Sequence, residues 1–162
     1  KILNFNEVGE VWVKNSWLFN GYWNKPEATK EALLNGWCTV GDLGKLDDEG
    51  YLYLVDRKKN VIISGGQNIF PREIEEVLHQ NPAVSEAAVV GKRDDYWGEA
   101  VTAFIVLRPG KKITIDELRN ECSKDLARYK LPKEFLFVDN IPKNATGKIL
   151  HRDLRERLNR RG

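Results

Sequence analysis

Apolar and polar residues alternate along several short stretches in the first third of the chain, a period-two pattern typical of half-buried β-strands. The pattern predicts strands at residues 8–13, 37–40 and 51–55. Residues 26–33 favour a short helix, because they begin with a proline, which the first helical turn accepts. Acidic residues and a glycine at 47–50 favour a hairpin turn before the third strand. This part of the chain is therefore predicted to be rich in β-structure.

From residue 61 onward, the pattern changes to strands that alternate with helices. Strands are predicted at 61–63, 84–90, 100–107 and 135–138, and helices from 71 onward, from 114 to about 129 and from 150 to 160. The first of these helices places Ile74, Val77 and Leu78 on one face. Thr114 and Glu117 have the spacing of a capping box, in which both side chains bind backbone N–H groups at a helix start. Loops are predicted at the polar stretches 64–68 and 140–147.

A charged run at residues 56–60 separates these two parts of the chain. We expect a domain boundary there, with residues 1–58 forming the tail of a β-rich body and residues 59–162 a compact domain. The expected fold class is α+β, with a three-stranded antiparallel sheet flanked by helices in the small domain. Four of the five tryptophans lie within the first part, too many to bury in so short a stretch. We expect them to pack against a body that this sequence does not contain.

The composition is typical of one globular domain, or of a small domain with an extra lobe. Of the 162 residues, 41% are hydrophobic and 10% aromatic. Twenty-six lysines and arginines against twenty-four acids leave a net charge of +2. This balance disfavours a protein whose main task is to cover nucleic acid or an anionic membrane. The chain contains no methionine, even at position 1, and we expect it to be a piece of a longer protein.

The two cysteines, Cys38 and Cys122, lie far apart in the sequence, and only two histidines are present. This spacing fits neither a disulfide framework nor a metal site, so we expect no metal ligands and free thiols in a reducing cytosol. No apolar run reaches the roughly 18 residues of a membrane helix, and the first residues lack the apolar centre of a signal peptide. We therefore expect a cytoplasmic protein without a membrane span.

A loop at residues 142–149 presents Lys148 directly after a glycine. The loop is not a phosphate-binding P-loop, because that motif requires glycine where Pro142 stands and serine or threonine where Ile149 stands. A lysine on such a loop is still able to stabilise negative charge that develops during a group transfer. Taken alone, however, an exposed loop lysine is more often a solvated charge.

Two other places combine glycine with candidate chemistry. Gly65 and Gly66 let the backbone approach a narrow ligand closely, although an ordinary turn explains them equally well. Asp42, which follows Gly41, offers a carboxylate suited to the hydroxyls of a ribose, although a turn-forming aspartate is the simpler interpretation. From residue 143 onward, seven lysines and arginines stand against two acids. This stretch leaves open a non-enzymatic module that binds nucleic acid or a partner protein through its basic C-terminal helix.

Three segments taken together, at residues 36–42, 51–75 and 142–149, resemble the adenylate-forming (AMP-binding) superfamily. Its members include acyl-CoA synthetases, coumarate-CoA ligases, luciferases and the adenylation domains of peptide synthetases. The resemblance covers nearly the whole chain, but only the C-terminal portion of such an enzyme. It implies a large N-terminal domain that carries the phosphate loop, the acid pocket and the expected Mg²⁺ site, and a mobile C-terminal lid domain.

The resemblance implies the activity of an acyl-CoA synthetase. Such an enzyme joins a carboxylic acid, here favoured to be a fatty acid, to ATP, and then transfers the acyl group to coenzyme A. Asp42 and Arg57 would bind the nucleotide, and Lys148 would be the catalytic lysine of the adenylation step. Without the N-terminal domain, the chain would be inactive.

The resemblance also implies residues for the second step. Lys59 would be the hinge of the lid domain; some relatives carry aspartate there, so a pivot is expected rather than proton transfer. Gly65 and Gly66 would lie on the loop that lines the coenzyme A passage. An alternative within the superfamily is an adenylation domain that loads the pantetheine of a carrier protein.

Overall fold

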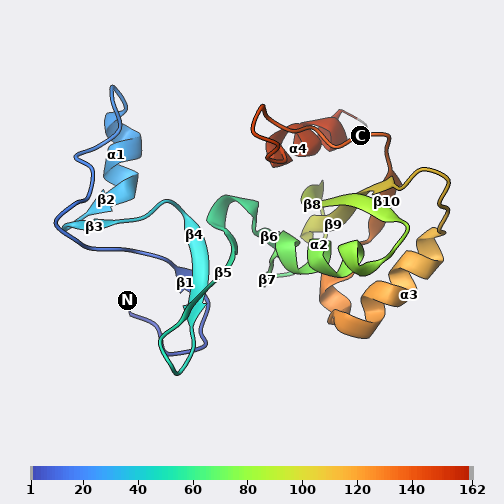
Figure 1. Cartoon of the computed structure of the whole chain (residues 1–162), viewed down its shortest axis with the longest axis horizontal. Helices are drawn as coiled ribbons and strands as arrows, with labels where there is room; N and C mark the ends of the chain where they lie inside the picture. Colours follow the sequence, from blue (N-terminus) through green and yellow to red (C-terminus); the bar gives the residue numbers. More distant parts are fainter. Residues whose placement is uncertain (1, 161–162) are drawn as a thin grey trace. The chain divides into compact units, whose positions relative to one another are not determined.

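The computed structural model describes residues 2–160 and divides into two compact units, Lys1–Lys59 and Asn60–Gly162 (Figure 1). The boundary predicted from the charged run lies between residues 58 and 59. The molecule combines helices with largely antiparallel sheets, so the predicted α+β class is confirmed.

The first unit consists of two small antiparallel sheets and one short helix. Its larger sheet has the strand order β1 (Gly9–Glu10), β4 (Asp42–Leu46), β5 (Leu52–Arg57), and its smaller sheet pairs β2 (Leu33–Leu34) with β3 (Trp37–Cys38). The helix α1 spans Pro26–Ala32, and a 3-10 turn at Lys58–Asn60 follows β5. The strands β1 and β3 are shorter than predicted. The sequence did not predict β2 or β4, and in β4 the reason is that Gly44 and Lys45 interrupt the apolar alternation.

The predicted hairpin turn between β4 and β5 is confirmed. The backbone N–H of Asp47 donates to the carbonyl of Tyr51 at 3.0 Å, and the N–H of Gly50 donates to the carbonyl of Asp47 at 3.0 Å. The side chain of Asp47 also accepts from the N–H of Tyr51 at 2.8 Å. The aspartate side chain and the glycine backbone therefore stabilise the turn in the way that makes these residue types common in turns.

The first unit buries few of its apolar side chains. Trp17 and Trp23 are 91% and 95% exposed. Leu52, Tyr53 and Leu54 follow one another in β5, and all three are about half exposed, at 49%, 52% and 52%. Because successive side chains of a strand point to opposite faces, both faces of this strand are open within the unit. The unit therefore lacks a hydrophobic core of its own among its described residues.

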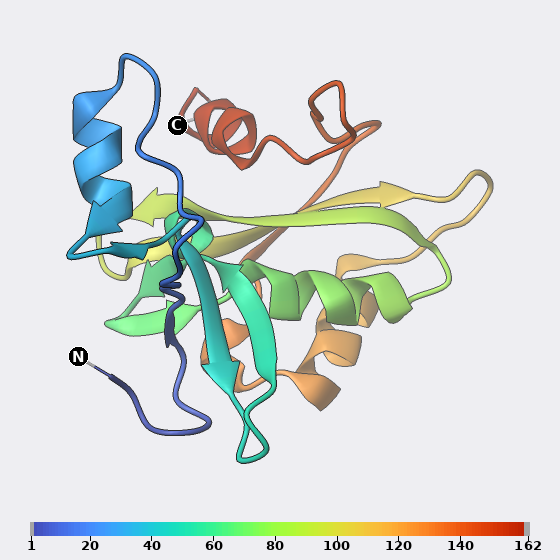
Figure 2. The same cartoon turned by 60° about the vertical axis from the view of Figure 1, so that its left-hand side comes forward.

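The second unit contains a five-stranded sheet rather than the three-stranded antiparallel sheet that was expected. The strands are β6 (Ile62–Ser64), β7 (Gln67–Ile69), β8 (Val84–Asp94), β9 (Gly98–Leu107) and β10 (Glu134–Phe137). The order is β10-β9-β6-β7, and β8 pairs with β9 in a long antiparallel ribbon (Figure 2). The pair β10-β9 is parallel, since a long crossover that contains a helix connects the two strands.

Three helices flank this sheet. They are α2 (Pro71–Gln80), α3 (Ile115–Asp125) and α4 (His151–Asn159). The capping box is confirmed: Thr114 Oγ1 accepts from the N–H of Glu117 at 3.2 Å, and Glu117 Oε2 accepts from the N–H of Thr114 at 2.7 Å. The helix α3 ends earlier than predicted, because Leu126 is extended and a separate 3-10 turn follows at Arg128–Lys130.

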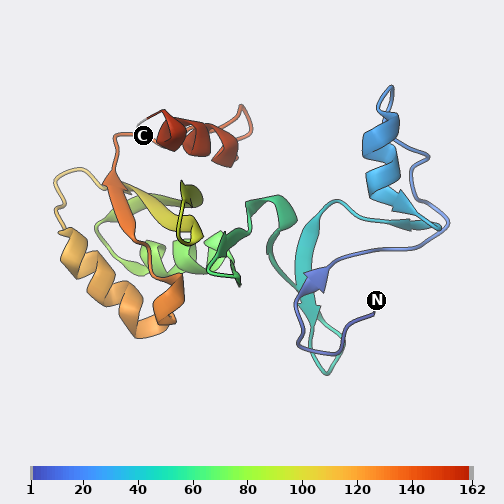
Figure 3. The ribbon, with the colours of Figure 1, turned by 180° about the vertical axis from the view of Figure 1, so that it is seen from behind.

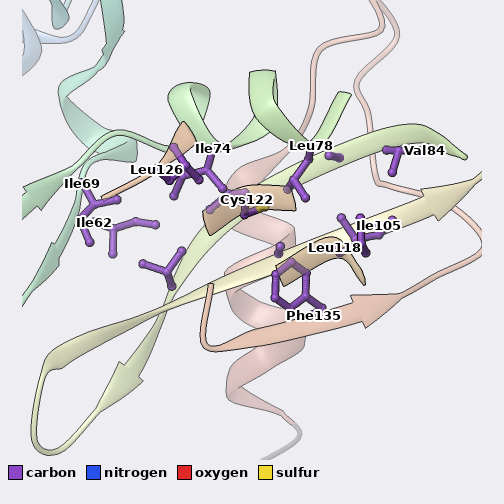
Figure 4. Close-up of a cluster of buried hydrophobic side chains, with 14 residues drawn as sticks. Ile62, Ile69, Ile74, Leu78, Val84, Ile105, Leu118, Cys122, Leu126 and Phe135 are labelled. Carbon is purple, nitrogen blue, oxygen red and sulfur yellow. The ribbon is translucent and has the colours of Figure 1, made fainter. Parts of the chain in front are cut away.

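The main core lies between one face of the sheet and the helices α2 and α3 (Figure 4). Each helix contributes fully buried side chains to it, such as Ile74 and Leu78 of α2 and Leu118 of α3. From the sheet, Val101 and Ile105 of β9 point to the same face. The helix periodicity seen in the sequence thus corresponds to a real buried face.

A second core lies on the opposite face of the sheet, under α4 (Figure 3). Leu154 and Leu158 of α4 pack with Ala88 and Val90 of β8 and with Phe104 of β9. Burial on both faces explains why β8 and β9 read as nearly continuous apolar runs in the sequence. It also fixes α4 to the sheet.

Candidate functional site

Asp42 and Arg57 lie opposite each other in the antiparallel pair β4-β5. Arg57 Nε donates to Asp42 Oδ1 at 2.7 Å, and Arg57 Nη2 donates to the carbonyl of Val40 at 3.0 Å. Each side chain of the ion pair is about one third exposed. The structure therefore brings these two predicted site residues together and leaves them accessible.

A hydrogen-bond network includes Gly41 and Lys58, the chain neighbours of this pair. Gly41 has a φ of +78°, a conformation that favours glycine. Its N–H donates to Thr39 Oγ1 at 3.0 Å, and that hydroxyl donates to Glu10 Oε1 at 3.1 Å. The other oxygen of Glu10 pairs with Lys58 Nζ at 2.9 Å. The sequence analysis missed Glu10 and Lys58, because these residues lie 48 positions apart and only the fold brings them together.

A cavity of about 700 Å³ lies next to Arg57 within the first unit. It combines cationic, acidic and aromatic side chains, a mixture suited to a ligand with both charged and planar parts. Its lining includes Glu10, Trp12, Tyr22, Lys25, Arg57 and Lys58.

Lys59 is exposed and lies in the 3-10 turn that follows β5. It is the last residue of the first compact unit. A short turn of this kind is a place where a few backbone dihedral angles are able to change without loss of core packing.

Gly65 and Gly66 form the two-residue turn of the hairpin β6-β7 and not a strand-to-helix loop as predicted. Ser64 and Gln67 pair across the turn, and the φ angles of the two glycines are +56° and +77°. Two consecutive positive φ angles are typical of a type I′ turn, which favours glycine at both positions. The prediction failed because polar residues in the short strand β7 resemble a loop in the sequence.

Trp97 lies against this glycine turn. The N–H of Gly65 donates to the carbonyl of Trp97 at 2.8 Å, and a Cβ at Gly65 would lie 2.9 Å from Cε3 of the Trp97 ring. The ring is 42% exposed, and Lys133 Nζ lies 3.8 Å from its centroid. The glycine turn therefore borders an exposed indole with a cation over it. The sequence analysis did not select Trp97 or Lys133 as site residues, because only the fold brings them to the turn.

Asp94 organises the turn that presents Trp97. Its Oδ1 accepts from the N–H groups of Trp97 at 2.8 Å and Tyr96 at 3.0 Å. The hydrogen bond from Trp97 holds the pKa of Asp94 below its usual range; desolvation opposes this shift, whereas Tyr96 and the charge of Lys133 add to it. The carboxylate form is therefore the one that the folded turn prefers.

We expect Asp94→Ala to lower the free energy of unfolding at pH 7 and to have a smaller effect at pH 3. A depressed pKa contributes stability above the unfolded value of about 3.9, and this contribution is lost as the pH falls through the folded value. Urea unfolding at the two pH values measures it, with Asp95→Ala as the matched control. An equal loss at both pH values would contradict the assignment.

Lys148 lies on an exposed loop. Asn144 holds the backbone of this loop: its Oδ1 accepts from the N–H groups of Thr146 at 3.1 Å and Lys148 at 2.8 Å. The N–H of Asn144 donates to the carbonyl of Lys148 at 2.9 Å, and Gly147 has a φ of +81°. The lysine is therefore presented by a closed turn, and the sequence analysis missed Asn144 as its organiser.

The thiols are unsuited to nucleophilic chemistry. Cys38 and Cys122 are both buried. Burial raises the pKa of the Cys122 thiol to about 11, and the charge of Glu121 adds to the shift. A thiol with such a pKa is protonated at neutral pH and is a poor nucleophile.

Among residues 2–160, no three histidine, cysteine or acidic side chains lie together in a way that could hold a metal ion. The resemblance implies a Mg²⁺ site in an N-terminal domain, and no described residue of this chain is assigned to that ion. In the same part of the chain, no helix combines the length and the apolar content needed to cross a bilayer.

Comparison with known proteins identifies the second unit. Residues 73–148 match the model of the AMP-binding enzyme C-terminal domain. Over 148 residues, the chain is 51% identical to the long-chain-fatty-acid–CoA ligase FadD13 of Mycobacterium tuberculosis. The match covers 91% of this chain and 29% of the ligase. The chain thus spans about three tenths of the length of the curated relatives that it matches.

Solved structures give the same result for the fold. The o-succinylbenzoate CoA synthetase (MenE) of Bacillus subtilis, in complex with its acyl-adenylate intermediate, has a TM-score of 0.89 at 43% identity. The match covers 94% of this chain and 31% of that enzyme. A Mycobacterium tuberculosis fatty acyl CoA synthetase has a TM-score of 0.67 at 49% identity, over 93% of this chain and 30% of that one. The chain therefore belongs to the adenylate-forming, AMP-binding superfamily and contains its C-terminal domain.

Proposed function

We propose that the chain is the C-terminal part of an ATP-dependent acid–thiol ligase, which forms an acyl-adenylate and then an acyl-CoA thioester. The observation that carries this proposal is that one compact unit presents two different exposed loops, one with Lys148 and one with Gly65 and Gly66. The first step requires a cation beside the carboxylate and the phosphate, whereas the second requires an open path for a long thiol. Separate loops on one movable unit meet both needs.

The nucleotide is assigned to the first unit. Asp42 is proposed to accept hydrogen bonds from the ribose hydroxyls of ATP and of the adenylate. Arg57 holds one carboxylate oxygen of Asp42 at 2.7 Å, so that the carboxylate is oriented before the nucleotide binds. Arg57 is also proposed to contact the nucleotide through its remaining donors.

Lys148 is proposed to contact the acid carboxylate and the α-phosphate during adenylation. Negative charge is shared between these groups in the transition state, and an ammonium group nearby stabilises it. Asn144 binds both the N–H and the carbonyl of Lys148, so the backbone that carries the lysine is held in place by the loop itself.

Coenzyme A is assigned to the glycine turn. Neither Gly65 nor Gly66 has a side chain to obstruct the thiol arm, and Trp97 offers an exposed indole beside them. An adenine ring stacks readily on an indole, and Lys133 supplies a cation for a phosphate at the same place.

We expect Trp97→Ala to raise the KM for coenzyme A by about tenfold or more, because base–aromatic stacking contributes about 1–3 kcal/mol. The KM for ATP in the adenylation step is expected to stay unchanged, and Trp97→Phe to retain most of the affinity. Steady-state kinetics of the full-length enzyme measure both constants. An unchanged KM for coenzyme A in Trp97→Ala would exclude this contact.

Lys59 is proposed as the hinge about which the second unit turns between the two steps. Its exposed position and its place as the last residue of the first compact unit, within a short 3-10 turn, support this role.

The remaining parts of the site are assigned to a large N-terminal domain. The open faces of β5 and the exposed tryptophans of the first unit support packing against such a body. The Mg²⁺ ion, the phosphate loop and the acid pocket would lie there. The acid is proposed to be a fatty acid, in line with FadD13, whereas MenE carries succinylbenzoate in its adenylate.

The test uses the full-length protein that contains this chain. With ATP, Mg²⁺ and a long-chain fatty acid, we expect release of pyrophosphate, and acyl-CoA only after coenzyme A is added. Succinylbenzoate and a carrier domain, tested in the same assay, distinguish the other acid and the other thiol. Residues 1–162 alone are expected to give no pyrophosphate, and tight binding of ATP to them in calorimetry would contradict the assignment of the site to two domains.

A further inference from the structure

Arg155 lies on α4 at a place where the helix meets the end of the hinge segment. Its Nη2 donates to the carbonyl of Asn60 at 3.2 Å, across 95 positions of the sequence. Asn60 directly follows Lys59 and is the last residue of the 3-10 turn. We propose that Arg155 is a positioning residue that couples movement at Lys59 to the Lys148 loop through α4. This inference rests on the proposed function.

The helix α4 is fixed firmly to the sheet. Leu154 and Leu158, on either side of Arg155, are 0% and 2% exposed. The first turn of the helix is held as well, because His151 Nε2 lies 3.4 Å from Glu75 Oε1. The same Glu75 oxygen accepts from the backbone N–H of Val89 at 2.8 Å. A residue that is bound to α4 is therefore expected to move together with the whole second unit.

The Lys148 loop is attached to the start of this helix. The N–H of Leu150 donates to the carbonyl of Pro142 at 2.9 Å, and the backbones of Lys143 and Ile149 form an isolated antiparallel β-bridge. Lys143 Nζ also lies 2.8 Å from Glu86 Oε2 of β8. The loop is therefore closed on itself, anchored to the sheet, and continuous with the helix that begins at His151.

These contacts make a continuous path from the hinge to the lysine. Asn60 is held by Arg155, Arg155 belongs to α4, and α4 continues directly from the loop of Lys148. Without the guanidinium contact, a rotation at Lys59 is partly absorbed by the backbone at residues 60–61. With it, the rotation is passed to the second unit as a rigid body.

The first test measures the contact itself in the full-length enzyme by TROSY-based backbone ¹⁵N relaxation. In Arg155→Ala, we expect the order parameters of Asn60 and Val61 to fall from the rigid range near 0.85 to below about 0.6. The matched control is Arg152→Ala on the same helix. The side chain of Arg152 is 89% exposed, and its Nε forms an ion pair with Glu156 one turn away. Unchanged order parameters in Arg155→Ala would overturn the proposal.

The second test measures coupling in the full-length enzyme. We expect Arg155→Ala to slow both half-reactions by about tenfold, with the KM for ATP unchanged. Arg152→Ala is expected to leave both rates unchanged. Arg155→Lys is expected to recover part of the rate, because lysine keeps the charge but not the planar guanidinium group. A more mobile hinge with unchanged rates would also overturn the coupling.

Thermal unfolding of each variant separates positioning from loss of the fold. If Arg155→Ala does not fold, Arg155→Lys and Arg155→Gln serve in both measurements, with the same expected order of effects. If the wild-type enzyme is active and Arg155→Ala has the same rates as Arg152→Ala, the coupling is refuted and the proposed function is not. A wild-type enzyme without adenylation activity refutes the proposed function and the coupling together.

Discussion

Replacing Lys148 by alanine in the full-length enzyme is expected to lower the rate of acyl-adenylate formation by about 10²–10³ and to spare most of the thioester formation from supplied acyl-adenylate. Loss of one preorganised charge contact at a transition state typically costs this much in rate. We expect the effect to be confined to the first step, because the proposed mechanism brings the ammonium group to the carboxylate and the phosphate only during adenylation.

The structure makes this substitution a clean test. The Lys148 side chain is exposed, and the loop is held by backbone groups and by Asn144, which accepts from the N–H of residue 148 whatever its side chain. Alanine therefore removes the charge and leaves the turn intact. Rapid quenching with radiolabelled ATP measures the first step, and release of AMP from supplied adenylate measures the second.

The matched control is Lys143→Ala, which removes a lysine from the same loop. Lys143 Nζ lies 2.8 Å from Glu86 Oε2, so its charge is paired with a carboxylate of strand β8. This variant loosens one anchor of the loop but keeps Lys148, so we expect it to lower adenylation much less than Lys148→Ala. Equal losses in the two half-reactions of Lys148→Ala would refute the assigned role.

Most long elements of the fold were predictable from the sequence. The apolar runs of β8 and β9, the face of α2 and the capping box of α3 are local signals, and each corresponds to an observed element. These signals are strong because the sheet is buried on both faces, so that burial and local pattern favour the same structure.

The elements that the sequence did not predict depend on contacts between distant residues. The strand β7 has two exposed polar residues, Gln67 and Asn68, and forms because it pairs with β6 across the glycine turn. The parallel direction of β10 follows from the crossover through α3 and not from any residue within β10. The alternation of apolar and polar positions predicts neither the pairing of β7 nor the direction of β10.

The same distinction applies to the candidate site. Asp42, Arg57, Lys148 and the two glycines carry recognisable local motifs, and the structure shows that Asp42 and Arg57 do pair. Trp97 has no such motif, because it reaches the glycine turn only through the register of β9 against β6. Residues that support a site, rather than carry its motif, became visible only once the fold was known.

Lys59→Pro is expected to slow thioester formation by about 10² in the full-length enzyme and to slow adenylation much less. Proline fixes φ near −65° and removes a backbone N–H donor, and it disfavours helical geometry in the residue before it, so it constrains the 3-10 turn that holds residue 59. We expect this constraint to hinder the proposed turn of the lid between adenylation and thioester formation. A misplacement of this kind, far from the chemistry, commonly costs about two orders of magnitude in rate.

The control for this hinge is Lys59→Ala, which removes the same side chain and keeps the freedom of the backbone. If the backbone is what matters at this position, Lys59→Ala retains both half-reactions within a few-fold, and only proline separates them. Single-turnover measurements of each half-reaction decide between the two cases. Thioester formation that is unchanged in Lys59→Pro, or equally slow in Lys59→Ala, would show that the second unit does not turn about this residue. In the second outcome, the ammonium group of Lys59 would have to act on the thiol step directly, because both substitutions remove it and only one of them constrains φ.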